Sequence, residues 1–228
     1  MQNIISREEE HLIRMMMRQG VLAFNVDKGF RLNSGRISPY FLDSGKLCNG
    51  ECLAAIGGAY AQRLQDERGK GLSFDAIYGP AYKGIPLAVT TSVALYQANN
   101  HRNFPVVFNR KEEKDHGEGG VLVGGPITRQ RVVITDDFIT AGTAVAESVR
   151  FIKENGGTPV GVITLFDRQE KGIDTDISAI QEILQKYGFR IFSILRFSHL
   201  LDFAQGGGLS GEVATALAQY RKEWGVEA

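Results

Sequence analysis

Two adjacent carboxylates, Asp136 and Asp137, follow the β-branched run RVVIT at 131–135 and precede FITAGTA at 138–144. Neighbouring negative charges repel each other, so placing both at the end of a buried strand is unfavourable and suggests that they have a function there. A single Asp there could be a helix cap, whereas a pair followed by small residues favours a polyol or metal-linked site. The turn 140–143 offers backbone N–H groups and hydroxyls at a helix start, which is an anion site. Together they suit a ribose 5-phosphate, with carboxylates on its hydroxyls and the turn on its phosphate.

Two further segments carry cations. In GPAYKGIP (79–86), Tyr82 and Lys83 lie in a turn between glycines, so backbone donors and an ammonium can meet a diphosphate. The alternative is a solvated lysine in a loop. RKEEKDHGEGG (110–120) is rich in glycine and cations, which favours a mobile lid, although its near-zero net charge also fits a surface turn. The cationic or titratable bases of this segment are Arg110, Lys111, Lys114 and His116.

Short β-branched runs indicate buried parallel strands, and helical stretches lie between them. The runs are 74–79, 105–109, 131–135, 159–166 and 189–195, and the helical stretches are about 85–97, 142–154 and 176–187. This alternation predicts an α/β fold with right-handed crossovers. Because ligands of open parallel sheets bind at the carboxyl ends of the strands, we expect the site to lie there.

Smaller elements are predicted on either side of this core. Ser6 and Glu9 have the form of a capping box at the start of a helix over 6–19. Residues 29–47 alternate between apolar and polar around SPYFLDSG, which predicts an antiparallel hairpin. Further helices are expected over 51–66 and 209–223.

Composition argues against several classes of protein. Lys plus Arg number 26 and Asp plus Glu 26, so there is no basic excess pointing to nucleic acid. No apolar run approaches the ~20 residues of a membrane-spanning helix, and the N-terminus lacks the apolar core of a secretory signal; we therefore expect a cytoplasmic protein without membrane contact. The glycine motifs of Walker A and dinucleotide folds are absent. Cys48 and Cys52 are expected to be small buried thiols, since zinc would need more ligands nearby.

The segment VVITDDFITAGTA (132–144) resembles the phosphoribosyl diphosphate (PRPP) binding motif of type I phosphoribosyltransferases. Thr135 stands where an aliphatic residue is usual and Phe138 where valine is common, but neither change removes a functional group. The resemblance extends to the bacterial-type orotate phosphoribosyltransferase family over roughly residues 10–200. The segments that carry it are GPAYKGIP (79–86), FNRKEEKDHGEGG (108–120) and SGRISPYFLDSGK (34–46).

This resemblance implies a type I phosphoribosyltransferase fold, with a five-stranded parallel core sheet flanked by helices and a small hood over the strand ends. Residues 1–70 would supply a helix and hairpin to the hood, 71–197 the α/β core, and 198–228 a C-terminal segment packing with the hood. It also implies a non-proline cis peptide in the diphosphate loop, with Ala81–Tyr82 as the expected bond.

The resemblance further assigns roles to individual residues. Lys114, Asp136 and Asp137 would be catalytic. The residues implied in PRPP binding are Lys28, Tyr82, Lys83, Arg110, Lys111, Lys114, His116, Asp136, Asp137, Phe138, Ile139, Thr140, Ala141, Gly142, Thr143 and Ala144. The residues implied in orotate binding are Lys28, Tyr40, Phe41, Thr140 and Arg168. An arginine fork suits the planar carboxylate of orotate.

The implied reaction joins PRPP to N1 of orotate and gives orotidine 5′-monophosphate and pyrophosphate, a step of pyrimidine biosynthesis. Mg²⁺ would be bound mainly through the diphosphate and ribose hydroxyls of the substrate, without a dedicated protein cage. The resemblance also implies a homodimer with shared active sites, in which the lid cations serve the partner's diphosphate.

Two other interpretations are weighed against this one. A phosphoribosyltransferase for a purine or another base would keep the ribose motif and change the hood. A regulator that senses PRPP without catalysis would usually add a DNA-binding segment, for which the sequence gives no sign. A fusion with orotidylate decarboxylase is not expected, since 228 residues leave no room for a second barrel domain of about 250.

Overall fold

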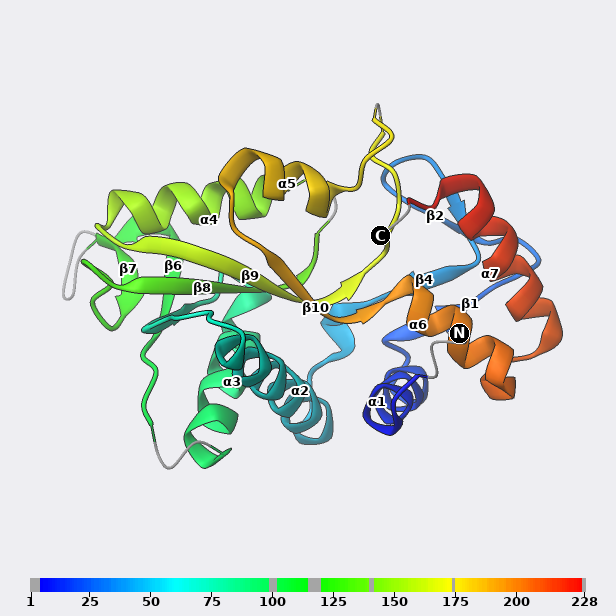
Figure 1. Cartoon of the computed structure of the whole chain (residues 1–228), viewed down its shortest axis with the longest axis horizontal. Helices are drawn as coiled ribbons and strands as arrows, with labels where there is room; N and C mark the ends of the chain where they lie inside the picture. Colours follow the sequence, from blue (N-terminus) through cyan, green and yellow to red (C-terminus); the bar gives the residue numbers. More distant parts are fainter. Residues whose placement is uncertain (1–4, 99–101, 115–119, 140–141, 174, 227–228) are drawn as a thin grey trace.

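A six-stranded sheet lies at the centre of the chain, whose computed structural model describes residues 5–98, 102–114, 120–139, 142–173 and 175–226. The strands are β5 (Ala76–Tyr78), β6 (Val106–Lys114), β7 (Gly120–Gly124), β8 (Arg131–Phe138), β9 (Thr158–Asp167) and β10 (Ile191–Arg196). They are ordered β10-β9-β8-β5-β6-β7 (Figure 1). All five predicted strands are present, and they pair with one another in parallel as expected. The predicted α/β class is therefore confirmed.

The predicted number of strands was wrong, because β7 adds a sixth, antiparallel strand beside β6 at the sheet edge. Its residues GVLVG are short and bounded by glycine, and the sequence favoured a glycine-rich lid there. In the structure, Phe108 pairs with Val123 and Lys114 pairs with Gly120. The described parts of the lid segment thus begin and end in a two-stranded arm.

Helices cover both faces of the sheet (Figure 1). They are α2 (Gly50–Gly69) and α3 (Gly84–Ala98) on one face, and α4 (Thr143–Glu154) and α5 (Ala179–Tyr187) on the other. In β8, Val133 belongs to the apolar cluster of the first face, whereas Val132 and Ile134 belong to that of the second. Successive strand residues point to opposite faces, so a strand covered on both sides must be apolar throughout. The uninterrupted run RVVIT reflects this burial.

A smaller group of elements from both ends of the chain lies beyond the sheet, at the right of Figure 1. We call it the hood. Its elements are α1 (Arg7–Arg18), β1 (Leu22–Phe24), β2 (Phe30–Arg31), β3 (Ile37–Ser38), β4 (Tyr40–Leu42), α6 (Phe197–Phe203) and α7 (Gly211–Trp224). The capping box is confirmed, since Ser6 Oγ accepts from the Glu9 amide while the Ser6 amide donates to the Glu9 carboxylate. The hairpin predicted within residues 29–47 is present as the antiparallel ribbon β2–β3, and β4 of the same segment pairs with β1 in a second antiparallel ribbon.

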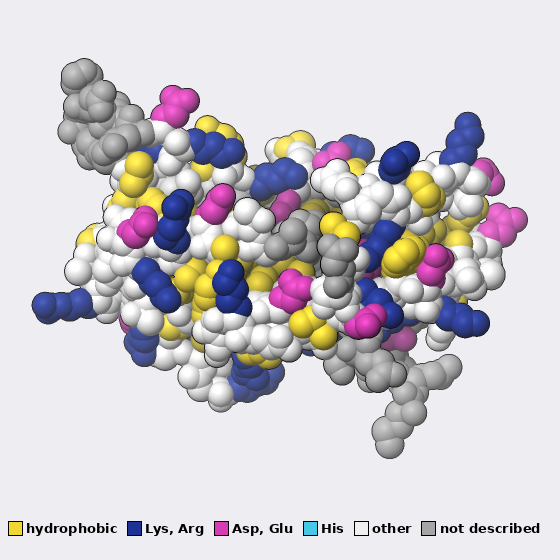
Figure 2. All heavy atoms as spheres, turned by 90° about the horizontal axis from the view of Figure 1, so that it is seen from above, with side chains coloured by type: hydrophobic (Ala, Val, Ile, Leu, Met, Phe, Trp, Pro, Cys, Tyr) yellow, Lys and Arg dark blue, Asp and Glu magenta, His cyan; other side chains and the backbone are white. Residues whose placement is uncertain are grey.

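The surface carries both signs of charge. In the face drawn in Figure 2, basic and acidic side chains are interspersed. Among the described residues, no helix combines the length and the apolar character needed to cross a membrane. Cys52 is buried as expected, but Cys48 is exposed, so the expectation of a buried thiol was wrong for Cys48.

Candidate active site

The acid pair lies at the carboxyl end of β8, the strand between β9 and β5. Asp136 is 7% exposed and Asp137 9%. The backbone around them is held by three hydrogen bonds. The Tyr60 hydroxyl of α2 donates to the Asp136 carbonyl at 2.7 Å, the Thr164 hydroxyl of β9 donates to the Asp137 carbonyl at 2.7 Å, and the Asp137 amide donates to Asp136 Oδ1 at 2.9 Å. Neighbouring elements therefore hold the main chain that carries both carboxylates, and the Asp137 amide orients the Asp136 carboxylate.

The carboxylate of Asp137 joins three parts of the chain. It accepts a short hydrogen bond from the Ser44 hydroxyl, and Lys83 Nζ lies 3.5 Å from the same oxygen. Lys83 Nζ also donates to Ser44 Oγ at 3.0 Å. Lys83 comes from the diphosphate loop and Ser44 from a 3-10 turn (Ser44–Lys46) that follows β4. The structure thus brings the predicted lysine to the predicted acid pair. Ser44 was missed, because a lone serine carries no signal in the sequence.

Burial and the neighbouring charge of Asp137 raise the pKa of Asp136 to about 7. The positive charge of Lys83 acts in the opposite direction on this pKa but is a smaller effect. A carboxyl group with a pKa near neutrality can either hold or release a proton at its Oδ atoms under ordinary conditions. Asp136 is therefore poised to accept hydrogen bonds from hydroxyl groups, and to carry a negative charge once a positive group lies beside it.

The diphosphate loop leads from β5 to α3 and contains the predicted cis peptide between Ala81 and Tyr82. The Asn109 side chain accepts from the Ala81 amide at 3.0 Å and from the Tyr78 hydroxyl at 2.8 Å. Asn109 lies on β6 and was not predicted as a site residue. Both of these contacts are with residues that are distant in the sequence, so no local sequence pattern indicates them. The loop also needs Gly79, since a Cβ there would lie 2.2 Å from the Gly84 carbonyl oxygen. These contacts set the path of the backbone around Lys83.

The lid cations begin beside this loop. Lys111 Nζ lies 5.0 Å from the ring centroid of Tyr82, a side chain that is 67% exposed. Arg110 and Lys111 lie on β6, and Lys114 is its last residue. His116 lies outside the described residues. The structure therefore brings Tyr82 and Lys111 together at the edge of the site.

A cavity of about 320 Å³ opens beside the acid pair at the start of α4. It is lined by Asp136, Phe138, Ile139, Gly142, Thr143, Ala144, Val145 and Glu147. Gly142 is the N-cap of α4 and has a φ of 71°, a left-handed conformation that glycine adopts without strain. Thr140 and Ala141 lie outside the described residues. The helix N-terminus and the cavity together suit an anion next to a polyol.

The residues predicted to bind a base lie on the hood side. Tyr40 and Phe41 are neighbours on β4 and point to opposite faces, as strand geometry requires. Tyr40 is fully buried, whereas Phe41 is 40% exposed and stacks on Phe30 at 5.5 Å between centroids. The guanidinium of Arg168, which follows β9, lies 4.5 Å above the Tyr40 ring. Lys28 is exposed in the turn before β2.

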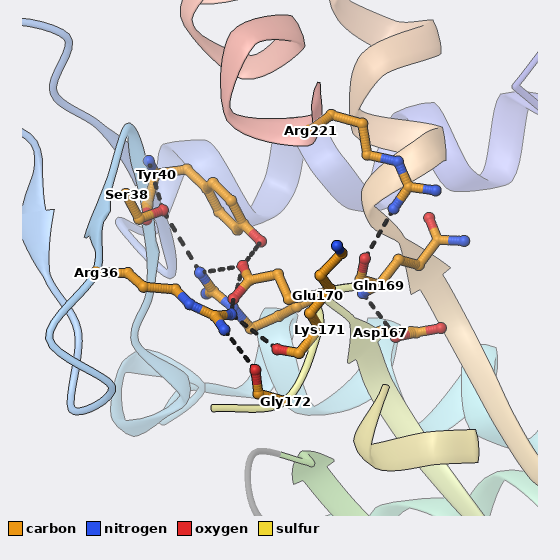
Figure 3. Close-up of polar contacts among 10 residues, drawn as sticks. Arg36, Ser38, Tyr40, Asp167, Gln169, Glu170, Lys171, Gly172 and Arg221 are labelled. Carbon is orange, nitrogen blue, oxygen red and sulfur yellow. Dashed lines mark hydrogen bonds and ion pairs between the residues drawn. The ribbon is translucent and has the colours of Figure 1, made fainter. Parts of the chain in front are cut away.

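Arg168 is held by further polar contacts, with Glu170 and Ser38, which are both labelled in Figure 3. Its Nε donates to Glu170 Oε1 at 2.8 Å, and its Nη2 reaches Ser38 Oγ at 3.5 Å. Glu170 also contacts Arg36, whose side chain is 8% exposed. Neither Glu170 nor Arg36 was predicted as a site residue, although both flank predicted ones.

Comparison with known proteins identifies the family to which this fold belongs. The family model for the phosphoribosyl transferase domain matches residues 47–189, which contain the diphosphate loop, the acid pair and Arg168. The fold and the acid pair thus define a phosphoribosyltransferase.

Full-length relatives narrow the class. The chain is 46% identical over 219 residues to the orotate phosphoribosyltransferase of Thioalkalivibrio sulfidiphilus, covering 96% of this chain and 98% of the relative. It is 45% identical over 220 residues to that of Saccharophagus degradans, covering 96% and 98%. The crystal structure of the Francisella tularensis orotate phosphoribosyltransferase matches with a TM-score of 0.82 at 34% identity, covering 94% of this chain and 99% of that one. This chain belongs to the orotate phosphoribosyltransferase family.

The raised pKa of Asp136 predicts how stability varies with pH. In the unfolded chain this carboxyl ionises near its ordinary pKa of 3.8, and in the folded chain near 7. Between these values the folded chain binds more protons, so this group's contribution to the free energy of unfolding falls as pH rises. In urea unfolding, Asp136→Asn should therefore be more stable than the unmodified chain at pH 8 by on the order of 1–3 kcal/mol, with a smaller difference at pH 5.

Asp75, near the other end of β8, provides the control. Hydrogen bonds from Arg131 lower the pKa of Asp75 to about 2, so it is ionised in both states throughout this range. Asp75→Asn should change stability equally at both pH values. An Asp136→Asn effect that is also equal at pH 5 and pH 8 would contradict the raised pKa.

Proposed function

We propose that this chain transfers the phosphoribosyl group of PRPP to N1 of orotate, giving orotidine 5′-monophosphate and pyrophosphate for pyrimidine biosynthesis. The observation that carries the proposal is the buried acid pair, with Lys83 on one side and the α4 cavity on the other. The curated orotate phosphoribosyltransferases at about 45% identity support it. A more distant orotate phosphoribosyltransferase, from Mycobacterium tuberculosis, has been solved in complex with PRPP and shares the fold at 23% identity and a TM-score of 0.60.

In this proposal Asp136 and Asp137 accept hydrogen bonds from the 2′- and 3′-hydroxyls of the ribose. Breaking the bond at the anomeric carbon builds positive charge on the sugar ring, and two nearby carboxylates stabilise that charge. The pKa of Asp136, near 7 in the empty site, suits this role, because a developing cation favours its ionised form. The 5-phosphate binds at the N-terminus of α4, along the turn 138–144.

The departing diphosphate would be bound by cations. Lys83 and Tyr82 lie in the diphosphate loop, and Arg110, Lys111, Lys114 and His116 belong to the lid segment. Preorganised positive groups stabilise a leaving group as its charge develops. A closed lid would also keep water away from PRPP, so that N1 of orotate is the nucleophile that attacks.

Mg²⁺ is the proposed cofactor. Among the described residues, no group of three or more His, Cys, Asp or Glu side chains could hold a metal. Mg²⁺ prefers oxygen ligands and often binds through substrate phosphates with few protein carboxylates, which fits an acid pair that would lie beside the ribose hydroxyls. When bound, it would neutralise charge on the diphosphate.

Orotate would bind between hood and core. Arg168 would hold its carboxylate, since a guanidinium pairs with a carboxylate through two parallel hydrogen bonds. Phe41 offers an exposed aromatic face, while Tyr40 supports the Arg168 guanidinium from below. Lys28 and Thr140 complete the proposed contacts. Recognition of the base carboxylate is what would separate this chain from purine phosphoribosyltransferases.

We also propose a homodimer with shared sites and a cytoplasmic location. Helix α3 carries a row of exposed apolar side chains, namely Val89 at 43%, Val93 at 53% and Tyr96 at 41%. Spacings of four and three residues put them on one face of the helix, which a two-fold contact would cover. The lid arm would then extend to the partner's diphosphate site.

A direct assay tests the reaction. The protein is mixed with PRPP, Mg²⁺ and orotate, and the loss of orotate absorbance is followed. Adenine, hypoxanthine and uracil in place of orotate should give no product. Turnover of one of these bases without turnover of orotate would overturn the proposed substrate.

Removing the acid pair should abolish most turnover. Asp136→Asn combined with Asp137→Asn should lower kcat by roughly a hundredfold or more, because the charge that stabilises the sugar cation is lost. The fold should persist, since asparagine keeps the size of both side chains. Asp75→Asn, which removes a carboxylate near the opposite end of β8, should leave kcat unchanged. Near-normal activity of the double variant would refute the ribose assignment.

Arg168→Ala should weaken orotate binding more than PRPP binding. Loss of a charge-assisted pair costs roughly 1.5–3 kcal/mol, so the KM for orotate should rise about tenfold to a hundredfold. The KM for PRPP should change little. Arg190→Ala is the matched control, because Arg190 pairs with Glu67 at the other end of the sheet. Equal rises in both KM values would place Arg168 away from orotate.

Shared sites predict complementation between two inactive variants, Lys114→Ala and Asp136→Asn. A mixed dimer would hold one site with both defects and one with neither, so reassembly should restore about half of normal activity per heterodimer by symmetry. Activity is measured after unfolding and refolding the mixture, with subunit exchange verified by tagged chains. No recovery despite exchange would show that each chain supplies its own lid.

A further inference from the structure

Three charged side chains, Arg36, Arg168 and Glu170, meet where the hood joins the core; Figure 3 labels Arg36 and Glu170. Glu170 Oε1 lies 2.8 Å from Arg168 Nη2, and Glu170 Oε2 lies 3.5 Å from Arg36 Nη1. All three side chains are largely buried, with exposed fractions of 8% for Arg36, 14% for Arg168 and 12% for Glu170. Charges are rarely buried to this extent unless they are paired, so the group has a structural or a functional purpose.

Arg36 is fixed independently of Glu170. It lies between β2 and β3 and donates to the Lys171 carbonyl at 2.8 Å and the Gly172 carbonyl at 2.7 Å. Its guanidinium also lies 4.4 Å above the Trp224 ring at the end of α7. These contacts hold Arg36 without neutralising it, so its charge remains available to hold the Glu170 carboxylate in place.

Glu170 in turn fixes one edge of Arg168. The Nε and Nη2 atoms of Arg168 both lie 2.8 Å from Glu170 Oε1, and the Tyr40 hydroxyl donates to the same oxygen at 3.3 Å. The Tyr40 ring supports the guanidinium plane from one face. A guanidinium has five N–H donors in a rigid fork, so occupying the Nε edge aims the end formed by Nη1 and Nη2. That end is the one that a second carboxylate would use.

The net charge of the group would be balanced by one more anion. Two guanidiniums and one carboxylate carry a net charge of one positive unit in a largely buried place. A buried net charge is costly unless it is compensated, and a substrate carboxylate at Arg168 would compensate it. Without Glu170 the same place would hold two positive charges, and Arg168 would lose the partner that sets its direction.

We propose that Glu170 is a positioning residue for the base site: held by Arg36 of the hood, it aims the Arg168 guanidinium at the carboxylate of orotate. This rests on the proposed contact between Arg168 and orotate. The competing effect is repulsion between the anions Glu170 and orotate, which would make Glu170 weaken substrate binding. The two cases predict opposite changes in KM.

The experiment is a double-mutant cycle of Arg168→Ala and Glu170→Ala, with KM for orotate, KM for PRPP and kcat measured for each enzyme. Glu170→Ala alone should raise the KM for orotate about tenfold, within the range of coupling between contacting residues, and leave the KM for PRPP within about twofold. When Glu170→Ala is added to Arg168→Ala, the KM for orotate should change by less than about twofold. Glu170→Gln, a gentler change, should raise the KM for orotate in the same direction but less. It keeps the test decisive if Glu170→Ala fails to fold.

A purely structural Glu170 would lower Tm and the active fraction while both KM values stay unchanged, which would overturn the proposal. So would a lower KM for orotate, or equal effects of Glu170→Ala in both backgrounds. Asp176→Asn is the matched control, because Asp176 pairs with Lys171 in the same connection and its side chain is 91% exposed; it should change neither KM. If Arg168→Ala itself leaves the KM for orotate unchanged, the orotate contact fails and this inference with it. If only the Glu170 results fail, the orotate contact stands.

Discussion

The burial of two neighbouring carboxylates at the end of β8 is the constraint on which the rest of the site depends. The two carboxylates repel each other, and the surrounding elements hold them in place in two ways. Tyr60 of α2 and Thr164 of β9 donate to the main-chain carbonyls of Asp136 and Asp137, and Ser44 of the turn after β4 donates to the Asp137 carboxylate. Each is a hydroxyl, which can donate without adding charge. Lys83 Nζ lies 3.5 Å from Asp137 Oδ2 and supplies a positive charge beside the pair. The pair therefore keeps much of its electrostatic cost, which is expressed in the raised pKa of Asp136.

Much of the fold could be predicted from the sequence because its signals are local. Apolar runs such as RVVIT report strands that are buried on both faces, and the Ser6–Glu9 capping box reports a helix start within one turn of chain. Strand β7 was missed because five residues bounded by glycine resemble a loop until β6 pairs with them. The ribbon β2–β3 was predicted from the alternation over 29–47, whereas the ribbon β1–β4 was missed because β1 lies outside that alternating segment.

The candidate site shows the same division between local and tertiary signals. Asp136, Asp137 and Lys83 could be proposed from motif and position, and the structure brings them together. Ser44, Asn109 and Glu170 could not be found that way. Asn109 matters through a bond to the Ala81 amide, 28 positions away in the chain, and Glu170 through Arg36. Residues whose purpose is to orient another residue carry no pattern of their own, because their partners lie on other elements.

The distribution of charge explains how a chain with a formal net charge of zero can bind a highly anionic substrate. Acidic and basic side chains lie in different parts of the site, each where the proposed substrate would carry the opposite charge. Acidic groups lie where a sugar cation would develop, and lysines lie where a diphosphate would leave. At the proposed base site, Arg36 and Arg168 outnumber Glu170 by one, which would match the one carboxylate of orotate. Complementarity of this kind acts over a few ångströms, within the Debye length of about 8 Å at physiological salt, so it needs no basic excess on the surface. It does need fixed geometry, and the bonds that join hood to core through Arg36 and Ser44 supply it.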